Sequence, residues 1–407
     1  MPTVRLKAGH VQPVWAGHPW VYAQAIDRIE GGAIAGDEVS VVDPRGNLLG
    51  RGFYSPGSAI PVRLLVRDAA IRLDASFFRS RALQAIALRA SLGLGTGGAA
   101  GVSGPAETPT PSTTGYRLIN AEGDGLPGLI VDRYGDVLAL QMGTLGMKQR
   151  ESQIHEALWD VASPRAIVDR TSAQTAKTEG FTASSTVVRG EGVRELEFVE
   201  RGLRFRIPLE LGQKTGFYFD QRALRARVEE LARGKRVLDT YSFVGAFATA
   251  AARGGATEVV AVDESALALE VGAECAKQNG VGESIRFVKG DARRALAEAK
   301  GRFDIVIVDP PRLAPTRSAR EQALVAYSKL AESACRATAP GGIVVLCSCS
   351  AAVDLGSLTR SLATGATRAN TDATVLERWF QGPDHPVPAA FNEGLYLKAL
   401  LARVEPR

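Results

Sequence analysis

The sequence predicts an α/β protein. From about Val187 onward, short apolar runs alternate with longer helical stretches, a pattern that requires parallel strands joined by helical crossovers. Two of these runs, at 305–308 and 343–346, are rich in β-branched residues, as buried parallel strands are. Both runs end abruptly in polar or reactive side chains. Because ligands of open α/β sheets bind beyond the carboxyl ends of the strands, a functional site is expected there.

Residues 1–72 are expected to form a small β-barrel. The 407 residues of the chain exceed one ordinary domain. Short predicted strands at 38–42 and 48–54 flank a Pro-Arg-Gly turn, which is typical of such a barrel. Its basic and aromatic residues either form a nucleic-acid surface or divide between core and solvent, and composition leaves both open; they are Arg5, Lys7, His18, Trp20, Tyr22, Arg51, Tyr54 and Arg63.

Residues 73–186 are expected to form an α+β middle domain. A helix is predicted from Asp74 to about Leu94, with Asp74 or Ser76 as its N-cap. Residues 93–115 consist almost entirely of Gly, Ala, Ser, Thr and Pro, which predicts a flexible insertion. Further strands are predicted at 116–120, 128–133, 137–142 and 166–169, and a helix at 149–161.

The third expected domain, 187–407, carries the alternating pattern. Its strands are predicted at 236–239, 258–263, 285–288, 303–309, 343–347 and 395–401. This order favours a Rossmann-like sheet with helices on both faces.

Bulk properties narrow the class of protein. Hydrophobic residues make up 45% and charged residues 23%, as in folded soluble domains, and no apolar run approaches the ~20 residues of a membrane span. The N-terminus lacks the features of a secretory signal, so a cytoplasmic location and no membrane partner are expected. Four cysteines are too few for a disulfide framework. A net charge of +5 permits a polyanionic partner without demanding one.

A cofactor site is expected beyond the first strands of the third domain. Asp263 ends a predicted strand about 24 residues after Asp239, where such sheets place an acid for ribose hydroxyls. Asp291 follows the next strand and is suited to accept a hydrogen bond from an adenine amino group. The turn at 240–247 has Gly245 as its sole glycine, which disfavours a dinucleotide and favours S-adenosylmethionine. Alternatively, Asp263 and Asp291 only cap the following helices.

The expected nucleophile is Cys349. Residues two apart share one face of a strand, so Cys347 and Cys349 should point the same way, with Cys349 at or just beyond the strand end. Cys347 is more readily interpreted as core. No metal site is expected, because the Cys-x-Cys pair lacks a second cysteine pair and the histidines are scattered.

A thiolate at Cys349 suits chemistry on a pyrimidine. It can add to carbon 6 of cytosine or uracil and make carbon 5 nucleophilic toward a sulfonium methyl group. Asp309, fixed by Pro310 and Pro311, would hydrogen-bond the Watson–Crick edge of the base, which must first be unstacked into the pocket.

Eight stretches carry a family resemblance: 18–22, 121–129, 214–222, 242–243, 309–311, 348–350, 385–386 and 393–398. Over nearly its whole length the chain resembles the bacterial large-subunit ribosomal RNA cytosine-5 methyltransferases that carry an N-terminal PUA domain. The resemblance implies a PUA domain, a middle domain and a class I methyltransferase domain that binds S-adenosylmethionine and forms 5-methylcytosine in 23S rRNA.

The resemblance also assigns residues and a partner. Cys349 corresponds to the nucleophile, and Gln221, in a loop at 214–222, becomes a cofactor contact. The expected partner is 23S rRNA or a large-subunit assembly intermediate, and whether the chain is a homodimer is left open. With the strand-end residues, the expected cofactor contacts are Gln221, Tyr241, Phe243, Gly245, Asp263, Asp291 and Asp309.

Three alternatives stay open. A methyltransferase for the exocyclic amine of guanine or adenine shares Asp-Pro-Pro, but an aromatic residue usually follows that motif, and here Arg312 and Leu313 follow. A non-catalytic ribosome-assembly factor would bind RNA without methyl transfer. A uracil target would use the same thiol chemistry. The family's usual lysine after Pro-Pro is Arg312, and the insertion at 93–115 is a further departure.

Overall fold

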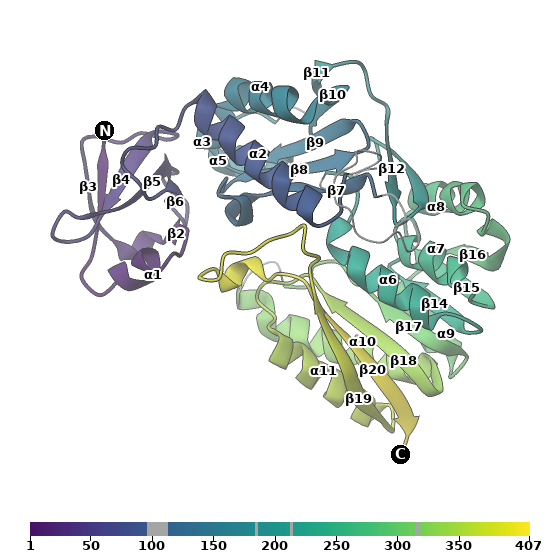
Figure 1. The fold of residues 1–407 in the computed structure, drawn as a ribbon. Coiled ribbons are helices and arrows are strands. Elements are labelled where there is room, and N and C mark those ends of the chain that lie inside the picture. Colours follow the sequence, from purple (N-terminus) through teal and green to yellow (C-terminus); the bar gives the residue numbers. More distant parts are fainter. Residues whose placement is uncertain (96–112, 184–185, 212–214, 315–316) are drawn as a thin grey trace. The chain divides into compact units, whose positions relative to one another are not determined.

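The computed structural model describes residues 1–407 except 96–112, 184–185, 212–214 and 315–316. It contains two compact units (Figure 1). The first comprises residues 1–219 together with 383–394, and the second comprises 220–382 together with 395–407. Most of the expected insertion, as well as Lys214, lies outside the described residues.

The N-terminal part of the first unit is a six-stranded sheet with the order β2-β6-β5-β4-β1-β3. Its core consists of the apolar side chains that alternate along the strands, such as Val4, Val39, Val41 and Val62. The strands are β1 (Thr3–Leu6), β2 (Trp20–Val21), β3 (Ile26–Glu30), β4 (Glu38–Val42), β5 (Leu48–Tyr54) and β6 (Val62–Val66), and helix α1 is Val11–Trp15.

The middle part is a five-stranded sheet covered by helices. Helix α2 (Ala75–Ser91) begins where expected, because Asp74 accepts a 3.0 Å hydrogen bond from the amide of Ser76. The sheet order is β11-β10-β9-β8-β7, with β7 (Gly115–Asn120), β8 (Leu129–Tyr134), β9 (Val137–Met142), β10 (Ala166–Asp169) and β11 (Val187–Gly190). The remaining helices here are α3 (Leu145–Lys148), α4 (Glu151–Ala162) and α5 (Ala173–Glu179).

Two boundaries differ from the expectation. β11 pairs antiparallel with β10, and the hairpin of β12 (Glu195–Glu200) and β13 (Leu203–Pro208) also belongs to the first unit. The unit that holds the Rossmann-like sheet therefore begins at Asp220 rather than at 187. The expected insertion also ends earlier than residue 115, because Gly115 is the first residue of β7 and Thr114 donates its amide to Val199 at 2.8 Å.

The second unit contains the predicted parallel sheet, in the order β16-β15-β14-β17-β18-β20-β19. Its parallel strands are β14 (Arg236–Thr240), β15 (Glu258–Asp263), β16 (Ile285–Lys289), β17 (Phe303–Val308) and β18 (Thr338–Ser348). β20 (Lys398–Pro406) lies antiparallel between β18 and β19 (Thr371–Phe380). The sequence did not indicate β19, whose residues alternate between half-buried and exposed along a sheet edge.

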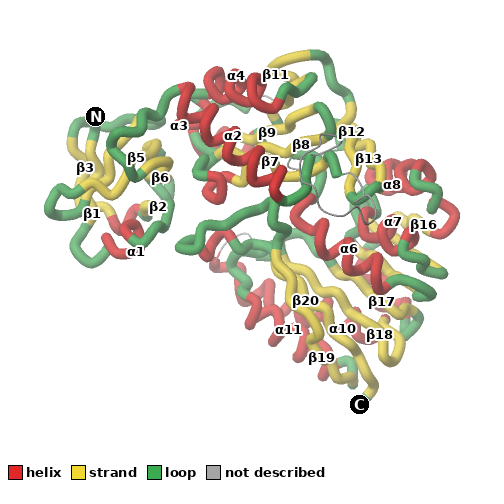
Figure 2. Tube along the Cα trace, in the orientation of Figure 1, coloured by secondary structure: helices red, strands yellow, loops and turns green. Residues whose placement is uncertain are grey.

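Helices cover both faces of this sheet, as Figure 2 shows in red around the yellow strands. α6 (Arg222–Leu231), α7 (Ala246–Arg253) and α8 (Ala266–Gln278) pack on the face that carries Val237, Ile307 and Cys347. α9 (Ala292–Ala299), α10 (Arg320–Ala337) and α11 (Leu355–Arg368) pack on the face that carries Leu238 and Val306. Alternation along the strands assigns each residue to one of the two cores.

Candidate functional site

The expected site residues of the second unit gather at the carboxyl ends of adjacent strands. Asp239 and Asp263 lie at the ends of β14 and β15, and Asp309 and Cys349 directly follow β17 and β18. Asp239 interacts electrostatically with both Asp263 and Asp309. The sheet order changes direction between β14 and β17, which is where open α/β sheets bind ligands.

The turn after β14 has an unusual backbone. Tyr241, Phe243 and Gly245 all have left-handed φ angles, of 60°, 52° and 65°. Such conformations cost about 1 kcal/mol or more for residues other than glycine and concentrate at functional sites. The turn is held by the Ser242 amide, which donates to the carbonyl of Val262 at 3.0 Å.

Asp263 fixes the same turn from β15. One of its carboxylate oxygens accepts the amide of Phe243 at 2.8 Å, and the other accepts the amide of Ser265 at 2.9 Å. The N-cap of α8 is Ser265, so Asp263 is not the capping residue. Each oxygen retains a second lone pair, which leaves this carboxylate suited to ribose hydroxyls.

Asp291 behaves differently. β16 ends at Lys289, so Asp291 lies two residues beyond the strand, is exposed, and caps α9 by accepting the amide of Arg293 at 2.7 Å. The capping alternative is thus present in the structure at Asp291. The cap occupies one carboxylate oxygen, and a contact of the other with adenine remains a proposal.

Gln221 and Asp309 form a direct pair. The side-chain amide of the buried Gln221 donates to Asp309 at 2.7 Å. Asp309 follows β17, and Gln221 lies immediately before α6, so this bond connects the start of that helix to the carboxyl end of β17. The family resemblance named Gln221, whereas its partner is seen only in the structure.

Asp239 is a buried acid. It is 1% exposed, and one oxygen accepts the amide of Ala248 in α7 at 3.1 Å. Burial raises the pKa of Asp239 to about 8. A buried carboxyl group in this setting is held mainly in its neutral form near pH 7.

The two neighbouring cysteines have different environments. Cys347 is fully buried among the core residues next to α6 and α7, and burial raises its pKa well above that of an ordinary thiol. Cys349, the first residue after β18, is half-buried, whereas Cys275 and Cys335 are buried like Cys347. Thiolate reactivity requires access, so Cys349 is the cysteine suited to react.

Two hydrogen bonds hold Ser350, the residue that follows Cys349. Ser350 accepts the amide of Ala314 at 3.1 Å through its hydroxyl, and its carbonyl accepts a 3.0 Å hydrogen bond from the ammonium of Lys398. Lys398 also interacts electrostatically with Cys349. Lys398 was not predicted as a site residue; the available signal was a lysine at the start of the apolar run 399–402.

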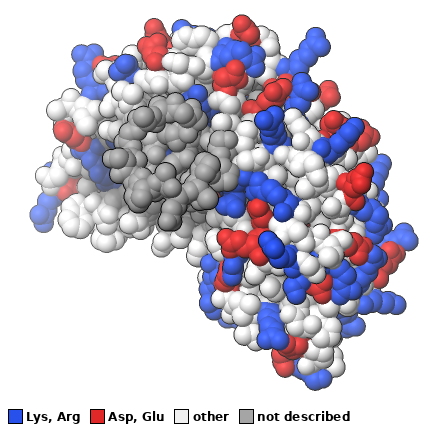
Figure 3. Space-filling view, turned by 45° about the vertical axis from the view of Figure 1, so that its right-hand side comes forward, with Lys and Arg blue, Asp and Glu red and all other residues white. Residues whose placement is uncertain are grey.

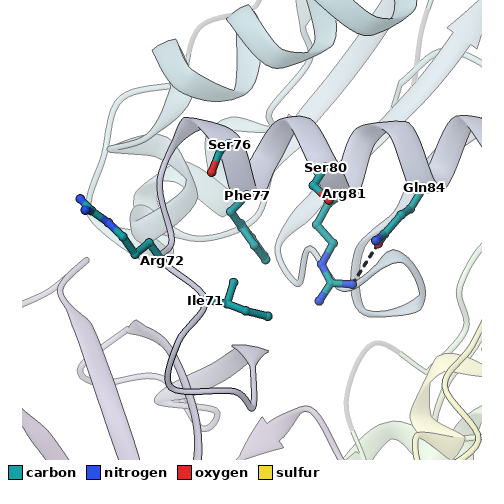
Figure 4. A pocket seen from close by; sticks show the side chains of 7 residues that line it. All are labelled: Ile71, Arg72, Ser76, Phe77, Ser80, Arg81 and Gln84. Atoms are coloured by element: carbon teal, nitrogen blue, oxygen red, sulfur yellow. Dashed lines mark hydrogen bonds between the residues drawn. The ribbon is translucent and has the colours of Figure 1, made fainter.

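A separate pocket lies in the first unit. It has a volume of about 370 Å³ and is lined by Ile71, Arg72, Ser76, Phe77, Ser80, Arg81 and Gln84. Arg81 points toward Gln84, to which it donates a 3.2 Å hydrogen bond, and Arg72 extends away from the other side chains (Figure 4). The lining includes two arginines and no acid.

The aromatic residues expected on the N-terminal domain make contacts within the first unit. Trp20 donates its indole N–H to Glu122 at 2.7 Å, and its ring packs against Phe391 with centroids 4.5 Å apart. His18 and Tyr22 both contact the carboxylate of Glu393. These three rings are therefore engaged in packing contacts, and the nucleic-acid surface stays a prediction.

Within the described ranges, no helix is long and apolar enough to cross a membrane. No group of three or more His, Cys, Asp or Glu side chains among these residues is arranged to hold a metal ion.

Comparisons with known proteins agree with this geometry. Residues 4–67 match the model of a PUA-like domain, and residues 162–403 match that of an S-adenosylmethionine-dependent methyltransferase. A crystal structure of a protein assigned as a methyltransferase, complexed with SAH, resembles the fold with a TM-score of 0.82 at 19% identity, over 99% of this chain and 100% of that chain.

Curated relatives align along nearly the full length. The ribosomal RNA large subunit methyltransferase I of Shewanella denitrificans is 35% identical over 98% of this chain and 99% of its own. The protein of the same name from Klebsiella pneumoniae is 33% identical over 99% of this chain and 98% of its own. The chain therefore belongs to the ribosomal RNA large subunit methyltransferase I family of S-adenosylmethionine-dependent methyltransferases.

Proposed function

We propose that this protein transfers a methyl group from S-adenosylmethionine to carbon 5 of a cytosine in 23S rRNA, with Cys349 as the covalent nucleophile. The observation that carries the proposal is the position of a half-buried thiol directly after β18, beside β17, the strand that Asp309 directly follows. The names of the relatives support the RNA substrate. Methylation of an exocyclic amine would leave this thiol without a role.

The residues around the turn after β14 fit S-adenosylmethionine. Gln221 Oε1, Asp239 Oδ1 and Ser242 Oγ are buried, and none accepts or donates a hydrogen bond within the described part of the chain. Buried polar atoms are normally satisfied, so such atoms at a strand-end site favour a polar ligand. The amino acid moiety and the ribose of the cofactor offer the matching groups. When bound, the cofactor supplies an electrophilic methyl group.

The chemistry assigned to Cys349 is nucleophilic catalysis. The thiolate adds to carbon 6 of cytosine, and the electron pair of the 5,6 double bond then makes carbon 5 nucleophilic. Carbon 5 forms the new carbon–methyl bond while the sulfonium–methyl bond breaks, which leaves the thioether. A base then removes the proton from carbon 5, the double bond re-forms, and the thiolate leaves carbon 6.

Asp309 is proposed to bind the target base. A carboxyl group at the end of β17 can hydrogen-bond the Watson–Crick edge of cytosine and stabilise the charge that develops on the ring during addition. The hydrogen bond from Gln221 orients this carboxyl group at 2.7 Å. The ring of the target base must gain a proton during thiolate addition, and a carboxyl group as hydrogen-bond partner suits this step better for cytosine than for uracil.

Contacts to RNA outside the catalytic site are proposed for Arg72 and Arg81 of the first unit. No acid lines the pocket itself, and both side chains are suited to phosphate oxygens. Arg72 also forms a 3.4 Å ion pair with Asp74, so Arg81 is the stronger candidate. Elsewhere, basic and acidic side chains are interspersed over the face shown in Figure 3. Arg81→Gln should weaken binding of a 23S rRNA fragment several-fold. The slope of the logarithm of the binding constant against the logarithm of salt concentration should become shallower by about one, the amount expected for one lost phosphate contact. An unchanged salt slope, equal to that of the control Arg294→Gln, would remove this contact from the proposal.

The decisive experiment is nucleoside mass spectrometry of unmodified 23S rRNA incubated with the protein and isotopically labelled S-adenosylmethionine. Label in 5-methylcytidine is expected, with loss of more than about a thousandfold in rate for Cys349→Ala and retention of activity in the control Cys335→Ala. Label in a methylated purine would favour an exocyclic-amine enzyme. Label in 5-methyluridine would move the target to uracil, and absence of label on RNA and on subunit particles would favour an assembly factor.

A further inference from the structure

We propose that Lys398 is a positioning residue for Cys349: its buried ammonium group holds the 348–350 turn and stabilises the thiolate. The inference rests on the proposed function for its catalytic meaning. The effect of the Lys398 ammonium on the Cys349 thiol can be measured without any methyl transfer.

The backbone brings the two residues together. Lys398 is the first residue of β20 and pairs with Ser348, the last residue of β18, so it lies directly across from the start of the Cys349 turn. Its ammonium donates to the carbonyl of Ser350 at 3.0 Å and to the carbonyl of Tyr396 at 2.9 Å. The bond to Ser350 and the strand pairing with Ser348 hold the residues on either side of Cys349.

Lys398 is a buried cation without a carboxylate in contact. The residue is 4% exposed, and within the described ranges no Asp or Glu lies within salt-bridge distance of its ammonium. Buried charges in proteins are normally paired, because an isolated ion loses its hydration. The third ammonium proton is therefore available for an anion, and the adjacent group that can become one is the thiol of Cys349.

Acidic side chains lie near Cys347, the residue two positions before Cys349. Besides burial, the nearby Asp309, Asp239 and Asp220 raise the pKa of the Cys347 thiol. Tyr327, on α10, also interacts electrostatically with Cys349 and Asp309. Facing Lys398 itself are Cys349 and Asp354.

The protonation of Lys398 fits this role. Burial lowers its pKa to about 8, and the interactions with Cys349 and Asp354 oppose that shift. At about pH 7 the amine is therefore still mostly charged. An ammonium beside a thiol lowers the pKa of the thiol, as at reactive cysteines in general.

The test is the pH profile of Cys349 alkylation by iodoacetamide in the full chain, followed by mass spectrometry of the Cys349 peptide. The other three cysteines are buried and serve as internal references. Lys398→Met should slow alkylation of Cys349 about tenfold near neutral pH, which corresponds to about one pKa unit. Lys398→Arg, which keeps the charge, should retain most of the wild-type rate, and Lys289→Met, at the exposed end of β16, should leave the profile unchanged.

Two outcomes would overturn the inference. One is an alkylation profile of Lys398→Met that matches the wild type. The other needs no variant, and so stands even if Lys398→Met fails to fold: a wild-type Cys349 whose apparent pKa is not below the ordinary value of about 8.5. If 5-methylcytidine is formed but either of these two outcomes is observed, Lys398 has no such role and the proposed function stands. A shifted profile without any methylated RNA would retain the Lys398–Cys349 coupling and reject the proposed function.

Discussion

The side-chain amide of Gln221 donates a 2.7 Å hydrogen bond to the carboxylate of Asp309. Gln221 lies immediately before α6, and Asp309 follows β17, so one bond ties the start of the second unit to the end of a central strand. The other amide atom of Gln221, Oε1, is buried and has no hydrogen-bond partner within the described ranges. Gln221 is thus placed to orient Asp309 with one atom and to contact a ligand with the other.

Replacing Gln221 should separate these two tasks. Gln221→Leu removes both contacts and leaves Asp309 without this donor, so SAH binding measured by calorimetry should weaken about tenfold or more. Gln221→Glu keeps the shape but sets two carboxyl groups in contact, which should raise the pKa of one of them and make SAH binding pH-dependent. Gln278→Leu, at the exposed end of α8, is the matched control. Equal affinities for all three variants would remove Gln221 from the cofactor site.

The strand-end arrangement was predictable because each residue lies where the apolar alternation of a strand stops. The sequence placed Asp263, Asp309 and Cys349 at strand ends, and the structure confirms those positions. Local patterning is sufficient here, since buried parallel strands read as continuous β-branched runs. The functional roles of these three residues stay predictions.

Other features depend on contacts that no local pattern contains. Segment 383–394 follows β19 in the chain yet belongs to the first unit, where the backbone carbonyl of Asp384 accepts a hydrogen bond from Arg89. The same holds for Lys398, whose burial results from its pairing with β18 and not from its neighbours in sequence. The edge strand β19 was missed because its exposed face carries Leu376 and Phe380 while its half-buried face carries Glu377, so the apolar alternation of a half-buried strand is lost.

The left-handed conformation of Gly245 gives a second prediction. A Cβ atom at this position would lie 2.8 Å from the ring of Phe287, whereas at Gly280, with a similar φ of 72°, a Cβ atom would meet nothing within 4 Å. Gly280→Ala should cost about 1 kcal/mol of unfolding free energy, the conformational term alone, and Gly245→Ala about 2 kcal/mol. SAH binding should weaken only in Gly245→Ala. Equal losses of stability in urea titrations would show that Phe287 moves aside without cost.

Asp239 gives a pH-dependent prediction. Its ordinary pKa is 3.8, and burial raises it to about 8 in the folded chain. Between these values the folded state holds a proton that the unfolded state has released, so the free energy of unfolding falls as pH rises through this window. Asp239→Asn lacks this titration. The variant should therefore gain stability relative to the wild type between about pH 5 and about pH 8 in urea titrations without ligand, and a constant difference across that range would contradict the raised pKa.

The buried ion pair of Arg89 and Asp124 yields the last prediction, for the first unit. Arg89 is 0% exposed and donates to both carboxylate oxygens of Asp124 and to the backbone carbonyls of Arg117 and Asp384. Arg89→Leu leaves a buried carboxylate without its cation and should lower the unfolding free energy by about 3–5 kcal/mol. The double replacement Arg89→Leu with Asp124→Leu should recover part of the loss, because it removes the uncompensated charge.

Tryptophan fluorescence in urea is a suitable readout, since Trp15, Trp20 and Trp159 lie in this unit. Arg294→Leu, which breaks an exposed pair with Glu298, should change the unfolding midpoint little. If Arg89→Leu were as mild as Arg294→Leu, the buried pair with Asp124 would contribute little to the stability of the first unit. If the double replacement were instead worse than Arg89→Leu alone, the loss would come from the severed bonds to Arg117 and Asp384 and from poorer packing rather than from the stranded charge of Asp124.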